Sequence, residues 1–206
     1  MDIWQRFERE LEEQRRAIPG GPQGWRPERL ILRDWWHWRD QELGFAHGRL
    51  ALTGQNAGGK SSLMALVVPV LLDGRIEPAR LDPAQSRDRF LHYYLLGGDE
   101  AEAGNPDAFR YEARTGYIAL EFYHTQEQRY LTIGMGVSAS RSNLRRITDW
   151  WGFLLLKGQR IGRGFDVRGA DGTCLGRREF ARLVGDGAIV VTEKAEYQRL
   201  VNDYLF

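Results

Sequence analysis

Eight consecutive residues, 54–61, read Gly-Gln-Asn-Ala-Gly-Gly-Lys-Ser and match the phosphate-loop pattern G-x-x-x-x-G-K-S at every required position. The glycines let the backbone curl, so that successive N–H groups face a chain of phosphates. Lys60 then places a positive charge near the β- and γ-phosphates, Ser61 offers a hydroxyl to Mg²⁺, and Ser62 stands near the α-phosphate. This chemistry predicts that the chain binds a nucleoside triphosphate together with Mg²⁺.

The residues expected to bind the nucleotide at this site belong to the loop and to the first turn after it. They are Gln55, Asn56, Ala57, Gly58, Gly59, Lys60, Ser61 and Ser62. Lys60 is the expected catalytic residue because it neutralises the phosphates, and Ser61 is the expected metal ligand. The alternative is a chance glycine-rich turn, and the flanking sequence argues against it.

The segments on either side of the loop have the pattern that a phosphate loop requires. Residues 49–53 alternate like a buried strand, and residues 61–72 are almost wholly apolar and long enough for a helix. The start of that helix would direct the positive end of its dipole at the phosphates. We expect residues 45–48 to turn the chain into the strand as an antiparallel pair, and Pro69 to kink or end the helix nearby.

Two further groups could contact the nucleotide. Trp35, Trp36 and Trp38 stand just before the loop, either as core residues or as a flat face for adenine, and Trp36 is the candidate for the second role. Arg87 and Arg89 either reach back to the nucleotide or are solvated charges at the start of a helix. The sequence leaves both pairs of alternatives open.

The charge of the chain gives no general attraction to nucleic acid, because the formal net charge is only +1. Any contact with DNA must therefore come from a local patch. One loop groups Arg141, Arg145 and Arg146. These arginines are either a solvated loop or a contact for a phosphate backbone.

The composition is that of a folded, soluble protein. The chain has 206 residues, of which 42% are hydrophobic, and a mean hydropathy of −0.50. No apolar run approaches a membrane span, and the first residues lack the order of a secretion signal. Cys174 is the only cysteine, so no intrachain disulfide can form. We therefore expect a cytoplasmic protein without a membrane partner.

The rest of the sequence predicts an α/β arrangement. Strands are expected over 29–33, 116–124, 129–137, 149–156 and 188–191, and helices over 2–18, 177–184 and from 192–193 to 205. Residues 1–22 would form an amphipathic helix and a linker, and residues 23–206 one domain. The first helix either packs on its own domain or docks on a partner.

The acidic motif that hydrolysis needs is missing. That motif places an acidic residue at the end of a second buried strand, where it orients Mg²⁺ and water. Glu121 and Glu193 both follow strand-like segments, but neither comes after four apolar residues that end in Asp-Glu. The sequence thus indicates a nucleotide-binding lobe that lacks its hydrolytic half.

This combination resembles a known class of proteins. Residues 29–82 are similar to the N-terminal part of an SMC-type (ABC-superfamily) ATPase head, whose phosphate loop reads G-x-N-G-x-G-K-S. Asn56 matches that form, whereas Ala57 replaces its usual glycine. Most of the chain after residue 28 looks like the MukB-like SMC ATPase subunits (JetC) of the bacterial Wadjet plasmid-defence systems. The segments that carry this second resemblance are Leu71-Leu72-Asp73-Gly74, Leu81-Asp82-Pro83, Ser86-Arg87-Asp88-Arg89, Tyr94-Leu95-Leu96-Gly97, Arg114-Thr115-Gly116-Tyr117 and Tyr130-Leu131-Thr132-Ile133-Gly134.

The resemblance implies the fold and the cofactors. The fold would be a P-loop NTPase of the α/β (α+β) class: the N-terminal lobe of a head, with a mixed sheet and an antiparallel β-layer. ATP and Mg²⁺ would be the cofactors, and Arg87 or Arg89 would match the arginine loop near ATP. In such proteins the C-terminal part of the chain supplies the acidic and signature motifs. The 206 residues would then be about half of one head, cut at Phe206.

The resemblance also implies partners. They would be the C-terminal half of the same head, a second head in a homodimer, kleisin and winged-helix subunits, and plasmid DNA. A coiled-coil arm would join the two halves of the head, and ATP cycling would drive DNA loop extrusion.

Two other functions remain open. The chain could be a self-contained P-loop enzyme, such as a small-molecule kinase, with Glu121 or Glu193 as its acidic residue. It could also be a binding module that does not hydrolyse ATP. The first would turn over ATP by itself, and the second would keep its partner interactions in a Lys60→Ala variant.

Overall fold

The computed structural model of this chain describes residues 24–35, 38–55, 59–77, 81, 91–97, 109–143 and 147–206. The helix predicted over 2–18 lies outside these residues. The division of the chain at residue 22 therefore stays a prediction.

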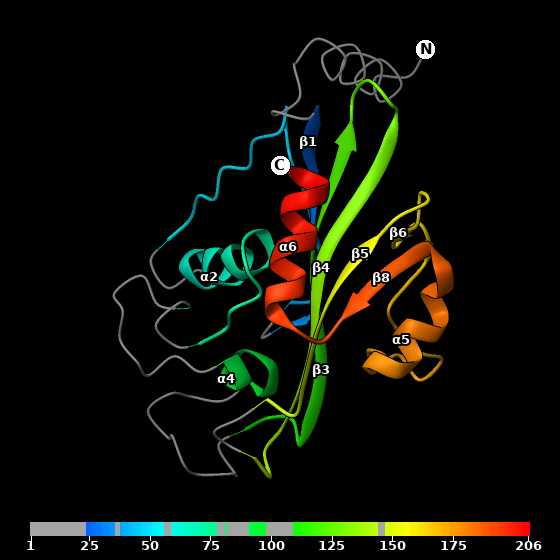
Figure 1. The fold of residues 1–206 in the computed structure, drawn as a ribbon. Coiled ribbons are helices and arrows are strands. Elements are labelled where there is room, and N and C mark those ends of the chain that lie inside the picture. Colours follow the sequence, from blue (N-terminus) through cyan, green and yellow to red (C-terminus); the bar gives the residue numbers. More distant parts are fainter. Residues whose placement is uncertain are drawn as a thin grey trace, which may run out of the picture.

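A six-stranded sheet forms the centre of the fold, in the order β2-β1-β3-β4-β5-β8 (Figure 1). Its strands are β1 (Trp25–Trp35), β2 (Trp38–Gly44), β3 (Ala113–His124), β4 (Arg129–Ser140), β5 (Asp149–Leu155) and β8 (Ala188–Val191). The predicted hairpin of β3 and β4 is confirmed, and the two strands pair along their whole length. The other strands predicted from 149 and 188 onward are present as β5 and β8. Two short strands, β6 (Arg160–Ile161) and β7 (Gly164–Phe165), form a separate parallel pair.

The expected mixed sheet is wrong for the described residues, because every neighbouring pair in the six-stranded sheet is antiparallel. The lengths of the connections give the physical reason. Only two residues separate β1 from β2, and four separate β3 from β4, so each chain segment returns beside the one before it. The fold is therefore mixed α/β, built on an antiparallel sheet.

The strand predicted over 49–53 is also absent. Ala46 and Arg49 form only an isolated bridge, and the chain that follows has no regular secondary structure up to the phosphate loop. The alternation itself is real, since Leu50 and Leu52 are half-buried against the core and the residues that follow each of them are exposed. Among the described residues, no backbone group of residues 50–53 forms a hydrogen bond, whereas Arg49 bonds only to Ala46. A strand needs a neighbour, and the described part of the chain supplies none beside residues 50–53.

Within the described ranges, four α-helices pack on the two faces of the sheet. They are α2 (Lys60–Leu71), α4 (Leu91–Leu96), α5 (Arg177–Val184) and α6 (Lys194–Leu205). Helices α2, α4 and α6 cover one face, and α5 lies on the other (Figure 1). The helices predicted after the phosphate loop, over 177–184 and up to 205 are confirmed. Helix α2 ends two residues after Pro69, as a proline within a helix leads one to expect.

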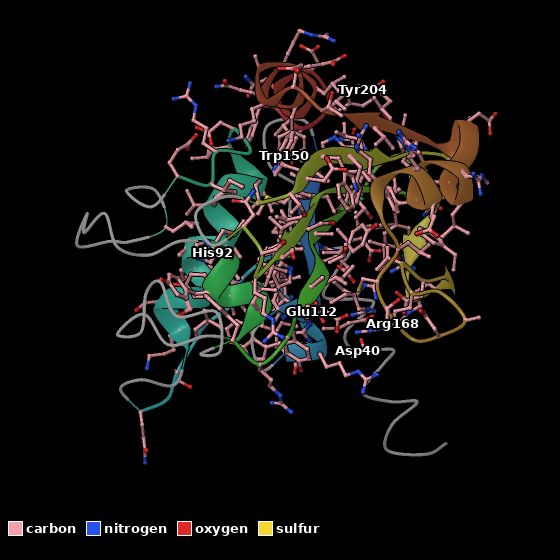
Figure 2. The ribbon with its side chains drawn as sticks, turned by 90° about the horizontal axis from the view of Figure 1, so that it is seen from below. Asp40, His92, Glu112, Trp150, Arg168 and Tyr204 are labelled. Atoms are coloured by element: carbon pink, nitrogen blue, oxygen red, sulfur yellow. The ribbon has the colours of Figure 1, made fainter. Side chains whose placement is uncertain are left out.

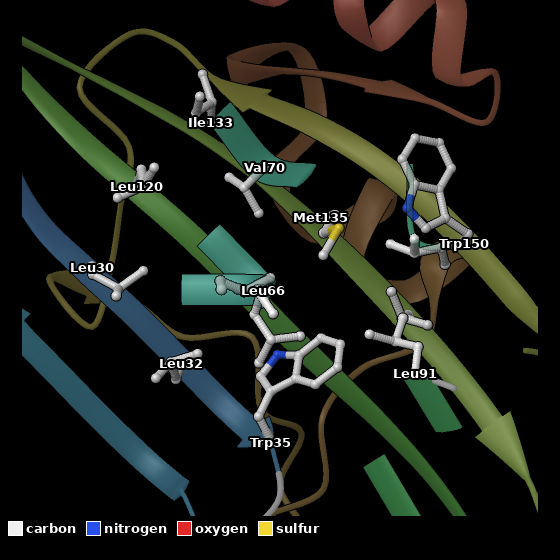
Figure 3. Packing of buried hydrophobic residues seen from close by; sticks show 14 of the residues in the cluster. Leu30, Leu32, Trp35, Leu66, Val70, Leu91, Leu120, Ile133, Met135 and Trp150 are labelled. Carbon is white, nitrogen blue, oxygen red and sulfur yellow. The ribbon is translucent and has the colours of Figure 1, made fainter. Parts of the chain in front are cut away.

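The core is split by the sheet into two apolar clusters. On the face of α2, residues from three neighbouring strands, Leu30, Leu120 and Ile133, pack with Leu66 and Val70 of the helix (Figure 3). On the other face, side chains of β3 and β5 pack against α5. The buried members of this second cluster are Ile31, Tyr117, Ala119, Trp151, Phe153, Leu155, Ile161, Val167, Cys174, Phe180 and Val184.

Glycines in β4 make the space that the aromatic rings of β5 occupy. A Cβ atom on Gly136 would lie 2.2 Å from the Trp151 ring, and one on Gly134 would lie 2.3 Å from the Phe153 ring. Both rings are fully buried. The two strands can therefore pair in this register only because β4 has no side chain at these positions.

Replacing Gly136 with alanine tests this packing. The new methyl group would collide with a ring that has no room to move, so we expect Gly136→Ala to lower the free energy of unfolding by about 2 kcal/mol. Urea denaturation measures the change. Gly44→Ala is the matched control, because nothing lies within 4 Å of a Cβ at that position. Equal stability of the two variants would contradict this account of the packing.

Candidate functional site

The described part of the phosphate loop leads directly into helix α2. Gly54 and Gly59 have φ angles of 148° and 81°, in the region that favours glycine. Gly59 is the N-cap, and its carbonyl accepts the first helical hydrogen bond from the N–H of Leu63 at 2.9 Å. The N–H groups of the first turn have no acceptor within the helix, so this end of α2 can bind an anion.

Lys60 is the first residue of α2, and its ammonium group bends back over the loop. Its Nζ donates to the carbonyl oxygens of Gly54 at 2.8 Å and Gln55 at 2.7 Å. Both acceptors are neutral. Among the described residues no carboxylate forms an ion pair with Lys60, so its positive charge remains available to an anionic ligand.

A pocket of about 360 Å³ opens beside Lys60. Strands β1 and β2, the segment before the loop, and the start of α2 form its wall. The lining residues are Leu32, Trp38, Gln41, Leu43, Leu50, Ala51, Leu52, Thr53, Gly59, Lys60 and Leu63. The mostly apolar wall with one cationic end suits a ligand that combines a flat ring with an anionic group.

Trp38 is the tryptophan that the structure places at this pocket. Its ring lies 2.9 Å from the position that a Cβ on Gly59 would take. Trp35 is instead fully buried in the core, and Trp36, the candidate for adenine contact, lies outside the described residues. Trp38 belonged to the group of tryptophans considered for adenine contact, but the sequence did not predict the strand β2 (Trp38–Gly44) that begins with it. The chain reverses between Trp35 and Trp38, which pair across the hairpin and therefore share a face.

The structure brings together only some of the predicted site residues. Gln55, Gly59 and Lys60 meet at the loop; Ser61 is exposed and Ser62 is buried in the first turn of α2. The remaining predicted residues lie outside the described part of the chain: Asn56, Ala57, Gly58, Trp36, Arg87 and Arg89. Among the described residues no three His, Cys, Asp or Glu side chains form a metal site. The role of Ser61 as a Mg²⁺ ligand therefore stays a prediction.

Glu121 lies on the face of the sheet that α5 covers, away from α2 and Lys60. Two arginines donate hydrogen bonds to both oxygens of its carboxylate. Arg29 donates to it at 2.8 and 2.7 Å, and Arg160 at 2.9 and 2.7 Å. Burial by itself would raise the pKa of Glu121, but the hydrogen bonds from Arg29 and Arg160 outweigh it and hold the pKa below its ordinary value. Glu121 is thus a structural anion with no oxygen left for Mg²⁺ or water.

The ion pairs continue from Glu121 to the edge of the sheet. Arg29 also donates to Glu42 at 2.6 Å, and Arg33 donates to the other oxygen of Glu42 at 2.8 Å. Arg33 and Asp166 form a further pair at 3.3 Å. Arg29 and Arg33 are four residues apart in β1, so the sequence period of a strand places them on one face. Two arginines four residues apart in one strand, together with a glutamate inside an apolar strand, form a sequence pattern from which this network could have been predicted.

Comparison with protein-family models finds none that matches this chain, and comparison with curated proteins finds no similar sequence. Within the described ranges, no helix combines the length and apolar character needed to cross a bilayer. Inference about function therefore depends on the phosphate loop and its surroundings.

The Glu121 network predicts a specific dependence of stability on pH. Because the pKa of Glu121 is held below its ordinary value of 4.5, its contribution is present above that pH and is lost as the pH falls further. We expect Glu121→Gln to lower the free energy of unfolding by about 3 kcal/mol at neutral pH, since it leaves buried guanidinium groups uncompensated. The difference from wild type should shrink as the pH falls below 4.5.

Denaturant titrations across this pH range measure both effects. Glu127→Gln is the control, because that exposed carboxylate pairs with the exposed Arg129, lies 3.9 Å from His124, and should contribute little. A constant difference between Glu121→Gln and wild type at all pH values would show that the carboxylate charge is not the source of the stability.

Proposed function

We propose that this chain is the ATP-binding N-terminal part of an SMC-like ATPase head, whose engagement with a second head drives DNA loop extrusion in bacterial defence against plasmids. One observation carries the proposal. A complete phosphate-loop sequence, which resembles that of SMC heads, leads into an apolar helix with Lys60 at its start and a pocket beside it.

The residues at this site suit ATP with Mg²⁺. The first-turn N–H groups of α2 and Lys60 would hold the phosphates, and the exposed hydroxyl of Ser61 would ligate Mg²⁺. Trp38 would contact the base or the ribose through its flat ring. The bound Mg²⁺ would supply neutralisation of the phosphate charge.

Two features support the idea that a second half completes this head. The segment before the loop, residues 50–53, has the side-chain alternation of a strand but no neighbour among the described residues. Helix α2 is apolar on all sides, yet Met64 is 50% exposed and Leu72, just after it, is 43% exposed. A helix of this composition is normally buried. The C-terminal half of the head would pair with the segment and cover the helix.

The self-contained enzyme is the weaker candidate because its acidic residues are poorly placed for it. Glu121 is committed to Arg29 and Arg160. Glu193 is exposed at the N-cap of α6. A catalytic carboxylate supplied by the C-terminal half would account for the missing acidic motif.

ATPase measurements test the proposal. We expect this chain alone to bind ATP weakly and to hydrolyse it hardly at all, because it lacks the acidic residue that orients water. Addition of the C-terminal half of the head as a second polypeptide should restore turnover. Lys60→Ala in the mixture should lower that turnover by roughly 100-fold, because a charge that stabilises the transferred phosphate is removed.

Steady-state phosphate release from the chain alone, from the mixture and from the Lys60→Ala mixture gives the comparison. Robust turnover by the chain alone would overturn the split-head proposal. A companion Glu193→Gln variant would then test the self-contained enzyme.

The position of Trp38 gives a second prediction. Loss of its ring should weaken Mg²⁺–ATP binding up to about tenfold, the size of an aromatic stacking contribution. Isothermal titration calorimetry of Trp38→Ala measures the change, and Trp38→Phe, which keeps a ring, is the control. Equal affinities of Trp38→Ala and wild type would remove Trp38 from the nucleotide site.

A further inference from the structure

A second pocket, of about 570 Å³, lies at the end of the sheet where β1 and β4 finish and β3 and β5 begin. Asp34 is part of its wall, and we call it the Asp34 pocket. In Figure 2, Arg168 and Asp40 lie toward the same side of the view. Arg168 binds Asp34, and Asp40 is the neighbour in sequence of the pocket residue Arg39. The volume is within the range that encloses a small molecule.

Arginines dominate the charge around the Asp34 pocket. Arg39 and Arg114 belong to its wall, and Arg168 stands directly behind Asp34. Asp34 is the one carboxylate among the lining residues. It is buried and already accepts hydrogen bonds from Arg114 at 3.1 Å and Arg168 at 3.0 Å. Two arginines and one carboxylate therefore line the pocket itself, while Asp171 binds the lining residue Thr173 and the charge of Asp40 acts on Arg168. The guanidinium of Arg39 has no partner among the described residues.

Two of these arginines, Arg114 and Arg168, are held in place before any ligand arrives. Asp34 has a φ of 58°, a conformation that few residues other than glycine adopt, and its carboxylate holds Arg114 and Arg168 together. Arg114 also stacks on the Tyr111 ring, 4.2 Å from its centroid. Arg168 further donates to the carbonyl oxygens of Gly172, at 2.7 Å, and of Arg39. Preorganised guanidinium groups are the preferred ligands of phosphate.

The rest of the wall is rich in hydroxyl groups. Thr115 and Ser138 hydrogen-bond to each other at 2.8 Å, and Thr148 is exposed at the rim. The hydroxyl of Thr173, also exposed, donates to Asp171 at 2.8 Å. Hydroxyls can donate to phosphate oxygens as readily as to one another. Burial raises the pKa of the Cys174 thiol in this wall, so it is neutral and does not repel an anion.

We propose that the Asp34 pocket binds a small phosphate-bearing molecule, separately from the phosphate loop. Trp38 and Arg39 are consecutive residues of β2 and line different pockets. The pocket beside the phosphate loop and the Asp34 pocket have no lining residue in common. Different substitutions can therefore change the two pockets separately.

The test uses the complete 206-residue chain with Lys60→Ala, so that the phosphate loop contributes as little as possible. Inorganic phosphate and AMP are the two probes, titrated while backbone amide signals are followed by NMR. We expect saturable shifts at Thr115, Thr148 and Thr173. Binding of both probes locates a phosphate site, and tighter binding of AMP indicates a nucleotide-sized ligand.

Two variants and a control assign the effect to the pocket. Arg39→Gln should weaken binding roughly tenfold, the cost of losing one charge-assisted hydrogen bond. Thr148→Glu should abolish binding, because it places a negative charge at the rim. Arg178→Gln removes an exposed arginine of α5 and should change nothing.

Three results would overturn the proposal: no saturable shift at the pocket, equal weakening by Arg39→Gln and Arg178→Gln, or shifts produced by a short DNA duplex but by neither small anion. The last result would assign this surface to nucleic acid. All of these outcomes are independent of the ATPase assay, because the phosphate loop has been disabled throughout.

Discussion

The fold depends on one buried carboxylate. Glu121 of β3 has no exposed surface, and its two oxygens accept hydrogen bonds from Arg29 of β1 and Arg160 of β6. Taking a carboxylate and two guanidinium groups out of water is costly, and complete pairing is what makes the arrangement stable. The two arginines lie 92 and 39 residues away from Glu121 in the sequence. This contact therefore fixes the positions of β1, β3 and β6 relative to one another.

The hairpin of β1 and β2 contributes to two pockets of different character. Trp38 lines the apolar pocket at the start of α2, and Arg39 lines the Asp34 pocket. The Glu121 network holds the same hairpin in place through Glu42 of β2. A shift of this edge strand by one residue would turn its side chains to the other face and separate Glu42 from Arg29 and Arg33.

Sequence patterns identified the elements whose structure is local. The hairpin of β3 and β4, helix α5 and the helix after Lys60 followed from periodicity, glycines and capping residues. The strand over 49–53 was wrong because periodicity reports which side chains face the core and not whether a neighbour is there to pair. The partners of Glu121 were missed because they depend on contacts between distant segments. The phosphate-loop pattern is contained in eight adjacent residues, and nucleotide binding by it stays a prediction.

The hydrogen bonds of Lys60 have a consequence for selectivity. Its ammonium group has three N–H donors, and the carbonyls of Gly54 and Gln55 accept from two of them, so one donor remains for a ligand. A neutral oxygen that replaced one of these carbonyls would gain nothing. A phosphate would gain, because its negative charge attracts the ammonium group. The loop's own backbone would thus favour an anionic ligand over a neutral one.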